Sequence, residues 1–214
     1  MLIKVYGSAI SGIVATTITI EVNVDKGINF LLVGLPDNAV KESQQRIASA
    51  LNYYGYKIPG KKIVINMAPA DLKKEGSAYD LPLAIGILGA SEQICSHKLA
   101  DYIIMGELSL DGSLNKIKGA LPIALEAKKQ GFKGIILPKC NAKEAAIVTD
   151  LEVYGADNIL EVINFFDGQS SLERTFIDIK QEFAKSLDNY EFDFIDVKGQ
   201  ESVKRAMEVA AAGS

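Results

Sequence analysis

The amino-acid sequence predicts an α/β fold (an α+β arrangement with a mixed sheet) in which β-hairpins are combined with β–α–β units. Residues 17–24 alternate polar and apolar side chains, as a half-buried strand does. Residues 106–114 predict a hairpin whose turn is Asp111-Gly112. Elsewhere, short apolar runs alternate with segments of helical periodicity. The apolar runs predict strands at residues 62–67, 102–105 and 134–138.

The first quarter of the chain is expected to form strands and one helix. Residues 2–34 predict β structure, with a turn at 25–27 and a buried strand at 28–33. Asp37 is a favourable N-cap for the helix that follows, and Gly55 ends it. The predicted apolar face of this helix carries Val40, Ile47, Ala48, Leu51 and Tyr54.

Further helices are predicted beyond residue 79. Residues 80–90 are apolar almost all round, so this helix belongs in the core, and Asp80 can cap it. A helix from about 119 to 129 is expected to bury Leu121, Ala124 and Leu125. Short helices near 143–147 and 158–166 are expected on either side of a strand at 151–154.

Charge divides the chain into three segments. Residues 1–166 carry 17 acidic and 17 basic side chains and are predicted to form one complete domain. Residues 167–196 carry 8 acidic and 3 basic side chains and predict an acidic linker, with a short helix around 179–187. Residues 197–214 predict an amphipathic helix. One helix does not make a domain, so this end is interpreted as the truncated start of a second one.

Composition argues against several classes of protein. The formal net charge of −4 disfavours a strongly basic nucleic-acid clamp. The sequence has no apolar run of membrane-spanning length and no signal-peptide pattern, so a cytoplasmic protein is expected. Cys95, Cys140 and the single His97 are too few for a Cys/His metal site. Without a Gly-rich phosphate loop, these residues alone are expected to hold no cofactor and to hydrolyse no nucleotide.

Two arrangements of polar residues are candidates for chemistry. Glu107 and Asp111 could form a glycosidase-like pair of acids, although solvated turn residues explain them better. Ser77 follows a glycine at the mouth of a helix, where it could pair with Lys116 or Lys118 as a serine–lysine dyad. The alternative is that Ser77 forms only the turn and the cap of the helix.

Lysines recur in pairs along the chain, and a basic face for the phosphate backbone of DNA would form if their loops converge. Solvated lysines scattered over the surface are the alternative. The candidate contacts are Lys61, Lys62, Lys73, Lys74, Lys116 and Lys118.

Several long motifs occur in the order found in one bacterial family. They are residues 1–24 (MLIKVYGSAISGIVATTITIEVNV), 31–90 (LLVGLPDNAV to LAIGILGA) and 105–138 (MGELSLDGSLNKIKG to GIILP). Residues 1–166 therefore resemble the N-terminal, ChlI-like domain of the magnesium-chelatase-like AAA+ ATPases, the competence-protein group often called ComM or YifB. The resemblance implies the fold shared by ribosomal protein S5 domain 2 and the Lon protease domain.

The resemblance to Lon proteases also locates their catalytic positions. Residues 74–80 match the nucleophile loop and place Ala78 at the position of the serine. Residues 106–110 match a later Lon motif, and counting onward places Leu121 at the position of the lysine. Alanine and leucine supply neither nucleophile nor base, so the resemblance implies the fold without the catalytic chemistry.

For the whole protein, the resemblance implies an ATP- and Mg²⁺-dependent hexameric motor that acts on branched DNA during natural transformation. Residues 192–213 (FDFIDVKGQESVKRAMEVAAAG) resemble the lead-in to its AAA+ module, where Val197, Gly199 and Gln200 would border the nucleotide. The chain is thus expected to be a non-catalytic accessory domain that contributes to DNA contact or to self-association in a ring, with no membrane contact. The alternatives are a peptidase that uses Ser77 in a shifted register, and a pure protein-interaction module.

Overall fold

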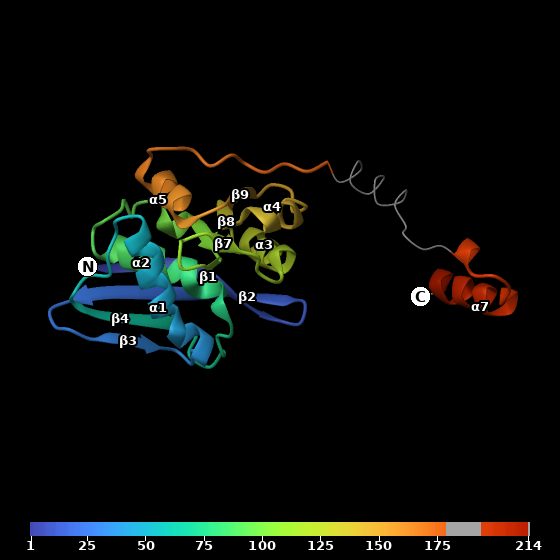
Figure 1. Ribbon diagram of the computed structural model, residues 1–214, viewed down its shortest axis with the longest axis horizontal. Helices are drawn as coiled ribbons and strands as arrows, with labels where there is room; N and C mark the ends of the chain where they lie inside the picture. Colours follow the sequence, from blue (N-terminus) through green and yellow to red (C-terminus); the bar gives the residue numbers. More distant parts are fainter. Residues whose placement is uncertain (179–193, 214) are drawn as a thin grey trace. The chain divides into compact units, whose positions relative to one another are not determined.

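The computed structural model describes residues 1–178 and 194–213 of the chain. It divides into two compact units, Met1–Phe176 and Ile177–Ser214, each of which is described by itself (Figure 1). The predicted helix around 179–187 lies outside the described residues.

The first unit contains a mixed sheet and five α-helices. Its strands are β1 (Leu2–Ser11), β2 (Val14–Asp25), β3 (Phe30–Val33), β4 (Lys62–Ala68), β5 (Tyr102–Ile104), β6 (Glu107–Leu108), β7 (Leu114–Asn115), β8 (Gly134–Pro138) and β9 (Glu152–Ala156). Its α-helices are α1 (Asn38–Tyr53), α2 (Asp80–Ala90), α3 (Ala120–Lys129), α4 (Lys139–Ala145) and α5 (Ile159–Asp167), and a 3-10 turn, η1 (Ser77–Tyr79), leads directly into α2.

Seven strands form one sheet in the order β3-β4-β2-β1-β5-β8-β9. The pairs β1–β2 and β2–β4 are antiparallel, whereas β3–β4, β1–β5, β5–β8 and β8–β9 are parallel. Strands β6 and β7 pair separately as an antiparallel hairpin, with Gly112 in its turn at a positive φ of 80°. The predicted α/β class with a mixed sheet is therefore confirmed.

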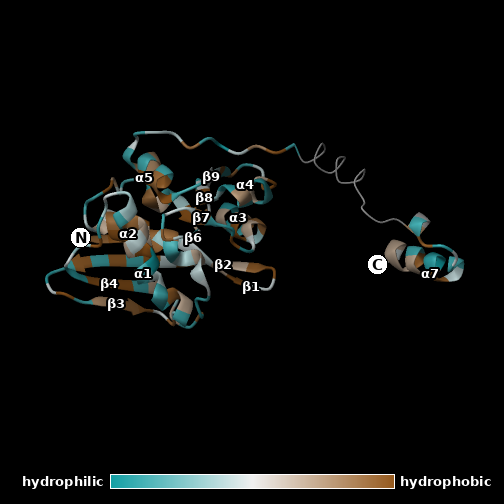
Figure 2. Ribbon diagram, in the orientation of Figure 1, coloured by the Kyte–Doolittle hydropathy of each residue, from teal (hydrophilic) through white to brown (hydrophobic). Residues whose placement is uncertain are grey.

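Helix α2 occupies the centre of the core, since every one of its residues is buried. A side chain at Gly86 would come within 2.7 Å of Val22, which shows how closely α2 lies on β2. Figure 2 shows hydrophobic and hydrophilic residues alternating along β2 and its neighbours, as the sequence predicts. The apolar residues of β2, including Ile18, Ile20 and Val22, are fully buried on the face toward α2.

The opposite face of the sheet is only partly covered. Thr17 and Thr19 of β2 point to this face, and together with Glu126 and Gln130 of α3 they line a hollow of about 730 Å³. Helices α2 and α3 thus lie on opposite faces of the sheet.

Three details of the sequence prediction are wrong. The segment 28–33 is not a buried strand, because Leu31 and Val33 are 44% and 52% exposed on the uncovered face of edge strand β3. Asp80 does not cap α2; it is the first residue of that helix, and its side chain binds Arg46 instead. In α3 the inward face is rotated, so that Leu125 is 54% exposed.

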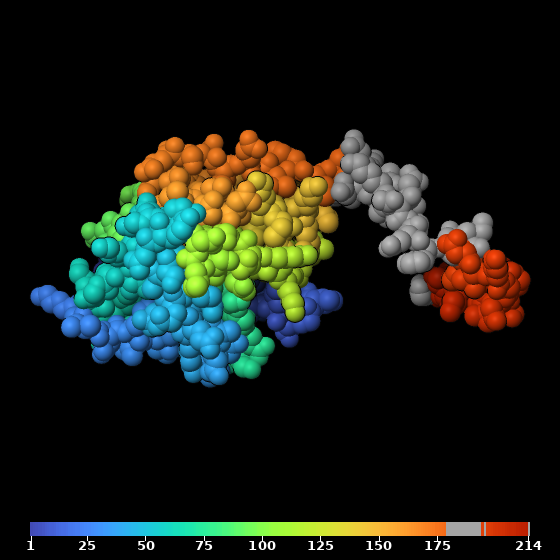
Figure 3. Space-filling model, in the orientation of Figure 1, coloured from blue at the N-terminus to red at the C-terminus, as the bar shows by residue number. Residues whose placement is uncertain are grey.

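The first unit continues past α5, because the chain returns along the edge of β9. The backbone N–H of Thr175 donates to Val153 O at 2.8 Å, and Arg174 bridges to Tyr154 as an antiparallel partner. In the space-filling view the orange surface at the end of the first unit lies directly beside the gold and yellow surface of the residues before it (Figure 3). This segment shields an otherwise open sheet edge.

The described part of the second unit contains a short turn, η3 (Phe194–Asp196), and the helix α7 (Glu201–Ala212). No residue of α7 is buried, and its apolar side chains Val203, Met207 and Val209 are exposed. Among the described helices of the whole chain, none has the length and apolar character needed to cross a membrane.

Candidate functional site

A cleft of about 810 Å³ opens beside the start of α2. Three segments meet there: the end of the β1–β2 hairpin, the loop before α2, and the connection from β6 to α3. The lining residues are Ser8, Ala9, Ile10, Ser11, Thr16, Asp37, Leu72, Lys73, Glu75, Gly76, Ser77, Ala78, Tyr79, Met105, Glu107, Lys116, Ile117 and Lys118. The cleft therefore collects both catalytic candidates of the Ser77 hypothesis and half of the candidate DNA lysines.

Asp37 joins the first helix to the loop on the wall of the cleft. Its Oδ1 accepts the N–H of Val40 at 2.8 Å, as the predicted N-cap of α1. Its Oδ2 accepts the N–H of Gly76 at 3.0 Å, and Gly76 has a φ of 83° that favours glycine. One carboxylate thus fixes both the start of α1 and the turn that leads into α2.

A buried ion pair fixes the other side of the loop. The guanidinium of Arg46 on α1 donates to Asp80 through Nε at 2.6 Å and Nη2 at 2.9 Å, and the N–H of Leu108 donates to Asp80 at 3.2 Å. Asp80 is fully buried. Burial raises the pKa of its carboxyl, which Arg46 opposes, while hydrogen bonding to Asp80 raises the pKa of Arg46. The pair ties α1, α2 and β6 together behind the cleft.

The prediction that Lys74 belongs to a basic surface is wrong. It is fully buried, and its Nζ donates to the carbonyl of Pro69 within the same loop. Its backbone is held as well, because its N–H donates to Leu35 O and its carbonyl accepts the N–H of Asp37. Burial lowers the pKa of its amine. Lys74 holds the loop in place, and its buried amine is not accessible to a ligand at the surface.

The hydroxyl of Ser77 is bound by a carboxylate rather than by an amine. Ser77 Oγ donates to Glu107 Oε2, and Glu107 Oε1 accepts Nδ2 of Asn115 at 3.1 Å. Lys116 and Lys118 line the same cleft, but within the described residues neither makes a hydrogen bond to Ser77. A serine–lysine dyad needs an amine to take the hydroxyl proton, and Glu107 occupies that position at Ser77.

The two positions matched to the Lon dyad hold inert side chains. Ala78 lines the cleft and its carbonyl accepts the N–H of Gly106 at 2.8 Å. Leu121 is half-buried in the first turn of α3, where its N–H donates to Glu144 at 3.0 Å, and it is not among the cleft residues. A methyl and an isobutyl group at these positions offer no nucleophile and no base.

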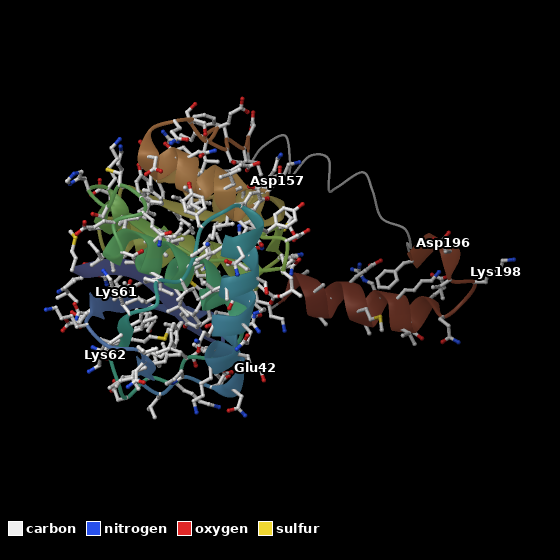
Figure 4. The ribbon with its side chains drawn as sticks, turned by 60° about the vertical axis from the view of Figure 1, so that its left-hand side comes forward. Glu42, Lys61, Lys62, Asp157, Asp196 and Lys198 are labelled. Carbon is white, nitrogen blue, oxygen red and sulfur yellow. The ribbon has the colours of Figure 1, made fainter. Side chains whose placement is uncertain are left out.

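The candidate DNA lysines separate into groups. Lys73, Lys116 and Lys118 line the cleft, and Lys73 pairs with Glu75 at 2.5 Å. Lys61 and Lys62 lie at the start of β4. Asp157 marks the region of Lys116, because its carbonyl accepts the N–H of Leu114 in β7, and Figure 4 shows Lys61 and Lys62 well apart from Asp157. The structure thus brings three of the six predicted lysines to one place.

The remaining candidate residues, the acids of the hairpin and the two cysteines, do not form a common site. Asp111 is exposed and binds Ser113 in the hairpin, whereas Glu107 binds Ser77 of η1, so the two acids have different partners. Cys95 and Cys140 are free and exposed. Within the described ranges, no group of three or more His, Cys, Asp or Glu side chains could hold a metal ion.

Val197, Gly199 and Gln200 lie together in the turn before α7. Gly199 and Gln200 both have positive φ angles, 72° and 59°, and all three residues are exposed. The described residues 194–213 supply one turn and one helix, which do not by themselves enclose a nucleotide.

Sequence reasoning missed Arg46 and Asn141. An arginine on the otherwise apolar face of α1 was a signal for a buried partner, because a charge on such a face needs one. Asn141 of α4 is fully buried and exchanges two hydrogen bonds with the backbone of Ile117. Its sequence context carries no sign of this role, since it depends on where α4 packs.

Comparison with known proteins places these features in a family. The family described as "Subunit ChlI of Mg-chelatase" matches residues 20–141. The chain is 41% identical over 210 residues to the competence protein ComM of Haemophilus influenzae and 44% identical over 210 residues to YifB of Escherichia coli K12, in each case over 98% of the chain. It is 26% identical over 138 residues, 62% of the chain, to the archaeal Lon protease of Thermococcus kodakarensis, of which it covers 21%.

The chain spans about two fifths of the curated relatives that it matches, 41% of ComM and 40% of YifB. The matched family covers β4, α2 and the loop between them, and the segment up to Asn141, so most of the cleft lies inside it.

Proposed function

The chain belongs to the family of subunit ChlI of Mg-chelatase, and from that premise we propose that it is a non-catalytic accessory domain of a magnesium-chelatase-like AAA+ ATPase. The distant similarity to a Lon protease and the mixed α/β sheet support a Lon-like fold for it, of the kind shared with ribosomal protein S5 domain 2. The chain covers 41% of ComM, which supports a role within a larger protein, and the resemblance of residues 192–213 to an AAA+ lead-in supports an ATP-driven one.

One observation carries the proposal. A cleft opens beside the start of α2, yet the position matched to the Lon serine is Ala78 and the position matched to the lysine is Leu121. Ser77, the neighbouring hydroxyl, donates to Glu107. The domain can therefore hold a ligand in this cleft without attacking it.

A peptidase assay tests the absence of catalysis. A fluorescently quenched casein substrate incubated with the chain is expected to show no cleavage above background, and Ser77→Ala is expected to leave this result unchanged. Cleavage by the purified chain that is lost in Ser77→Ala and retained in a Ser113→Ala control would overturn the proposal in favour of a shifted Lon-type peptidase.

Within the whole protein, Val197, Gly199 and Gln200 would border ATP and Mg²⁺ once the rest of an AAA+ module encloses them. The chain's contribution is then to assembly of the ring or to contact with what the motor acts on. The cleft lysines Lys73, Lys116 and Lys118 lie among three carboxylates, so formal charge in the cleft balances. A continuous phosphate backbone favours unbalanced positive charge, and we therefore favour a protein partner over DNA.

DNA contact is the second candidate, because three exposed lysines do gather at one cleft. A labelled forked DNA titrated at low salt separates the two. Duplex contact through these lysines would give binding that weakens steeply with salt and falls in Lys116→Gln with Lys118→Gln. Lack of binding at low salt, where the phosphate contribution is strongest, leaves the protein-interaction role.

A further inference from the structure

The connection between β7 and α3, residues 116–118, has one side of its backbone bound and the other side free. The N–H of Ile117 donates to Asn141 Oδ1 and its carbonyl accepts Asn141 Nδ2, both at 2.9 Å. A residue that exchanges both backbone groups with one partner has the geometry of a hydrogen-bonded pair in a β-ladder. The buried Asn141 amide thus imitates a neighbouring strand.

Residues 116–118 belong to no strand, and residue 118 lies in a bend. No described residue hydrogen-bonds the backbone N–H or carbonyl of Lys116 or Lys118. All three residues of this segment line the cleft, and both lysines are exposed. The segment therefore has unpaired backbone N–H and carbonyl groups at residues that line the cleft.

The formal charge of the cleft balances, but two of its lysines have no ion-pair partner. Asp37 accepts two backbone N–H groups, Glu75 is paired with a lysine, and Glu107 accepts a hydroxyl and an amide. In contrast, Lys116 and Lys118 form no ion pair with any residue that the structure describes. A ligand that brings carboxylates would meet two ammonium groups that form no ion pair within the described residues.

We propose that residues 116–118 bind an extended acidic peptide by adding it as a β-strand in the cleft. An added strand uses backbone hydrogen bonds for affinity and alternate side chains for specificity. Lys116 and Lys118 lie two positions apart, about 6.6 Å in an extended chain, so the peptide carries Asp or Glu at alternating positions. This inference rests on the proposed function, because a peptide held here is bound and not cut.

Nucleic acid fits this segment less well. A phosphodiester backbone has acceptors for the lysines and for N–H groups, but it has no donors for the free carbonyls of Lys116 and Lys118. A peptide strand supplies a donor and an acceptor at each paired residue. The backbone pattern therefore selects between two ligands that the lysine charges alone would both attract.

Fluorescence anisotropy with synthetic peptides tests the proposal. The probe is a fluorescein-labelled octapeptide of alternating glutamate and valine, which is expected to bind the full chain saturably. A peptide of the same composition with its four glutamates in a block, and one with lysine in place of glutamate, are expected to bind at least about five-fold more weakly. N-methylation of alternate backbone nitrogens removes strand donors and is expected to weaken binding at least about ten-fold.

Paired variants locate the site. Lys116→Gln with Lys118→Gln is expected to weaken the alternating peptide at least about five-fold. The matched control is Lys128→Gln with Lys129→Gln, two exposed lysines outside the cleft, which should leave binding unchanged. Circular dichroism of both variants establishes that they are folded.

Several results would overturn the proposal. They are no saturable binding of the alternating peptide, equal binding of its N-methylated form, an equal effect of the control variant, or displacement only by single-stranded DNA. Mass spectrometry of the incubated peptide tests the non-catalytic function separately from the peptide-binding site. A bound but cleaved peptide refutes the non-catalytic function while keeping the site, whereas an intact and unbound peptide refutes only the site.

Discussion

The buried pair of Arg46 and Asp80 should dominate the stability of the loop beside the cleft. The perturbation is Asp80→Asn, which keeps the shape of the side chain and removes its charge. Asp80 is fully buried and accepts three hydrogen bonds, two from Arg46 and one from the N–H of Leu108. An asparagine turns an NH₂ group toward these donors and leaves the Arg46 guanidinium, whose side chain is only 23% exposed, without its counter-charge.

Removing one partner of a buried ion pair costs about 3–5 kcal/mol of unfolding free energy. At a urea m-value of about 2 kcal/mol per molar, this lowers the unfolding midpoint by about 2 M. Asp150→Asn is the control, because Asp150 pairs with Lys128 at 3.3 Å while 85% exposed, and such a pair is worth less than about 1 kcal/mol.

Urea unfolding followed by circular dichroism at pH 7 measures both variants. Combining Arg46→Met with Asp80→Leu should recover part of the loss, because an apolar pair leaves no isolated buried charge. A cost below about 1 kcal/mol for Asp80→Asn, or one equal to that of Asp150→Asn, would show that the pair does not hold α1, α2 and β6 together.

Two further predictions concern single positions, and a third concerns nucleotide binding. Burial lowers the pKa of Lys74 below 10.5. Between the lowered pKa and 10.5 the unfolded chain binds more protons than the folded chain, so the free energy of unfolding rises with pH. Lys74→Met should abolish this rise in the urea midpoint, whereas Lys61→Met should not. Gly34→Ala should lower the free energy of unfolding by more than about 3 kcal/mol, because the φ of Gly34 is 105° and a Cβ there would lie 2.2 Å from Met67 O. Gly55→Ala is the control: Gly55 has a φ of 82° but open space around it, so the loss in the same urea titration should be only about 1–2 kcal/mol. Equilibrium dialysis should detect no ATP bound to residues 1–214, and tight binding would contradict the assignment of the nucleotide site to a larger module.

Hydrophobic periodicity and turn residues predicted most of the strands and helices. The alternation along β2 and the uniformly apolar α2 depend on which faces are buried, and that information is local, so strand and helix were both predicted correctly. Burial at the sheet edge was not predictable in this way. Leu31 and Val33 resemble core residues in sequence, and only the strand order shows that no helix covers their face.

The sequence by itself determined that Ala78 and Leu121, the positions that the resemblance assigns to the Lon dyad, carry no nucleophile and no base. It also determined the class of fold. Only the tertiary structure decided what remains at the site. Packing buried Lys74 and withdrew it from the predicted basic face, and it brought Lys116 and Lys118 to the wall of one cleft. It also placed Asn141 against a backbone 24 residues earlier in the chain. These relations join residues distant in sequence, and local patterns do not encode which helix or loop will meet them.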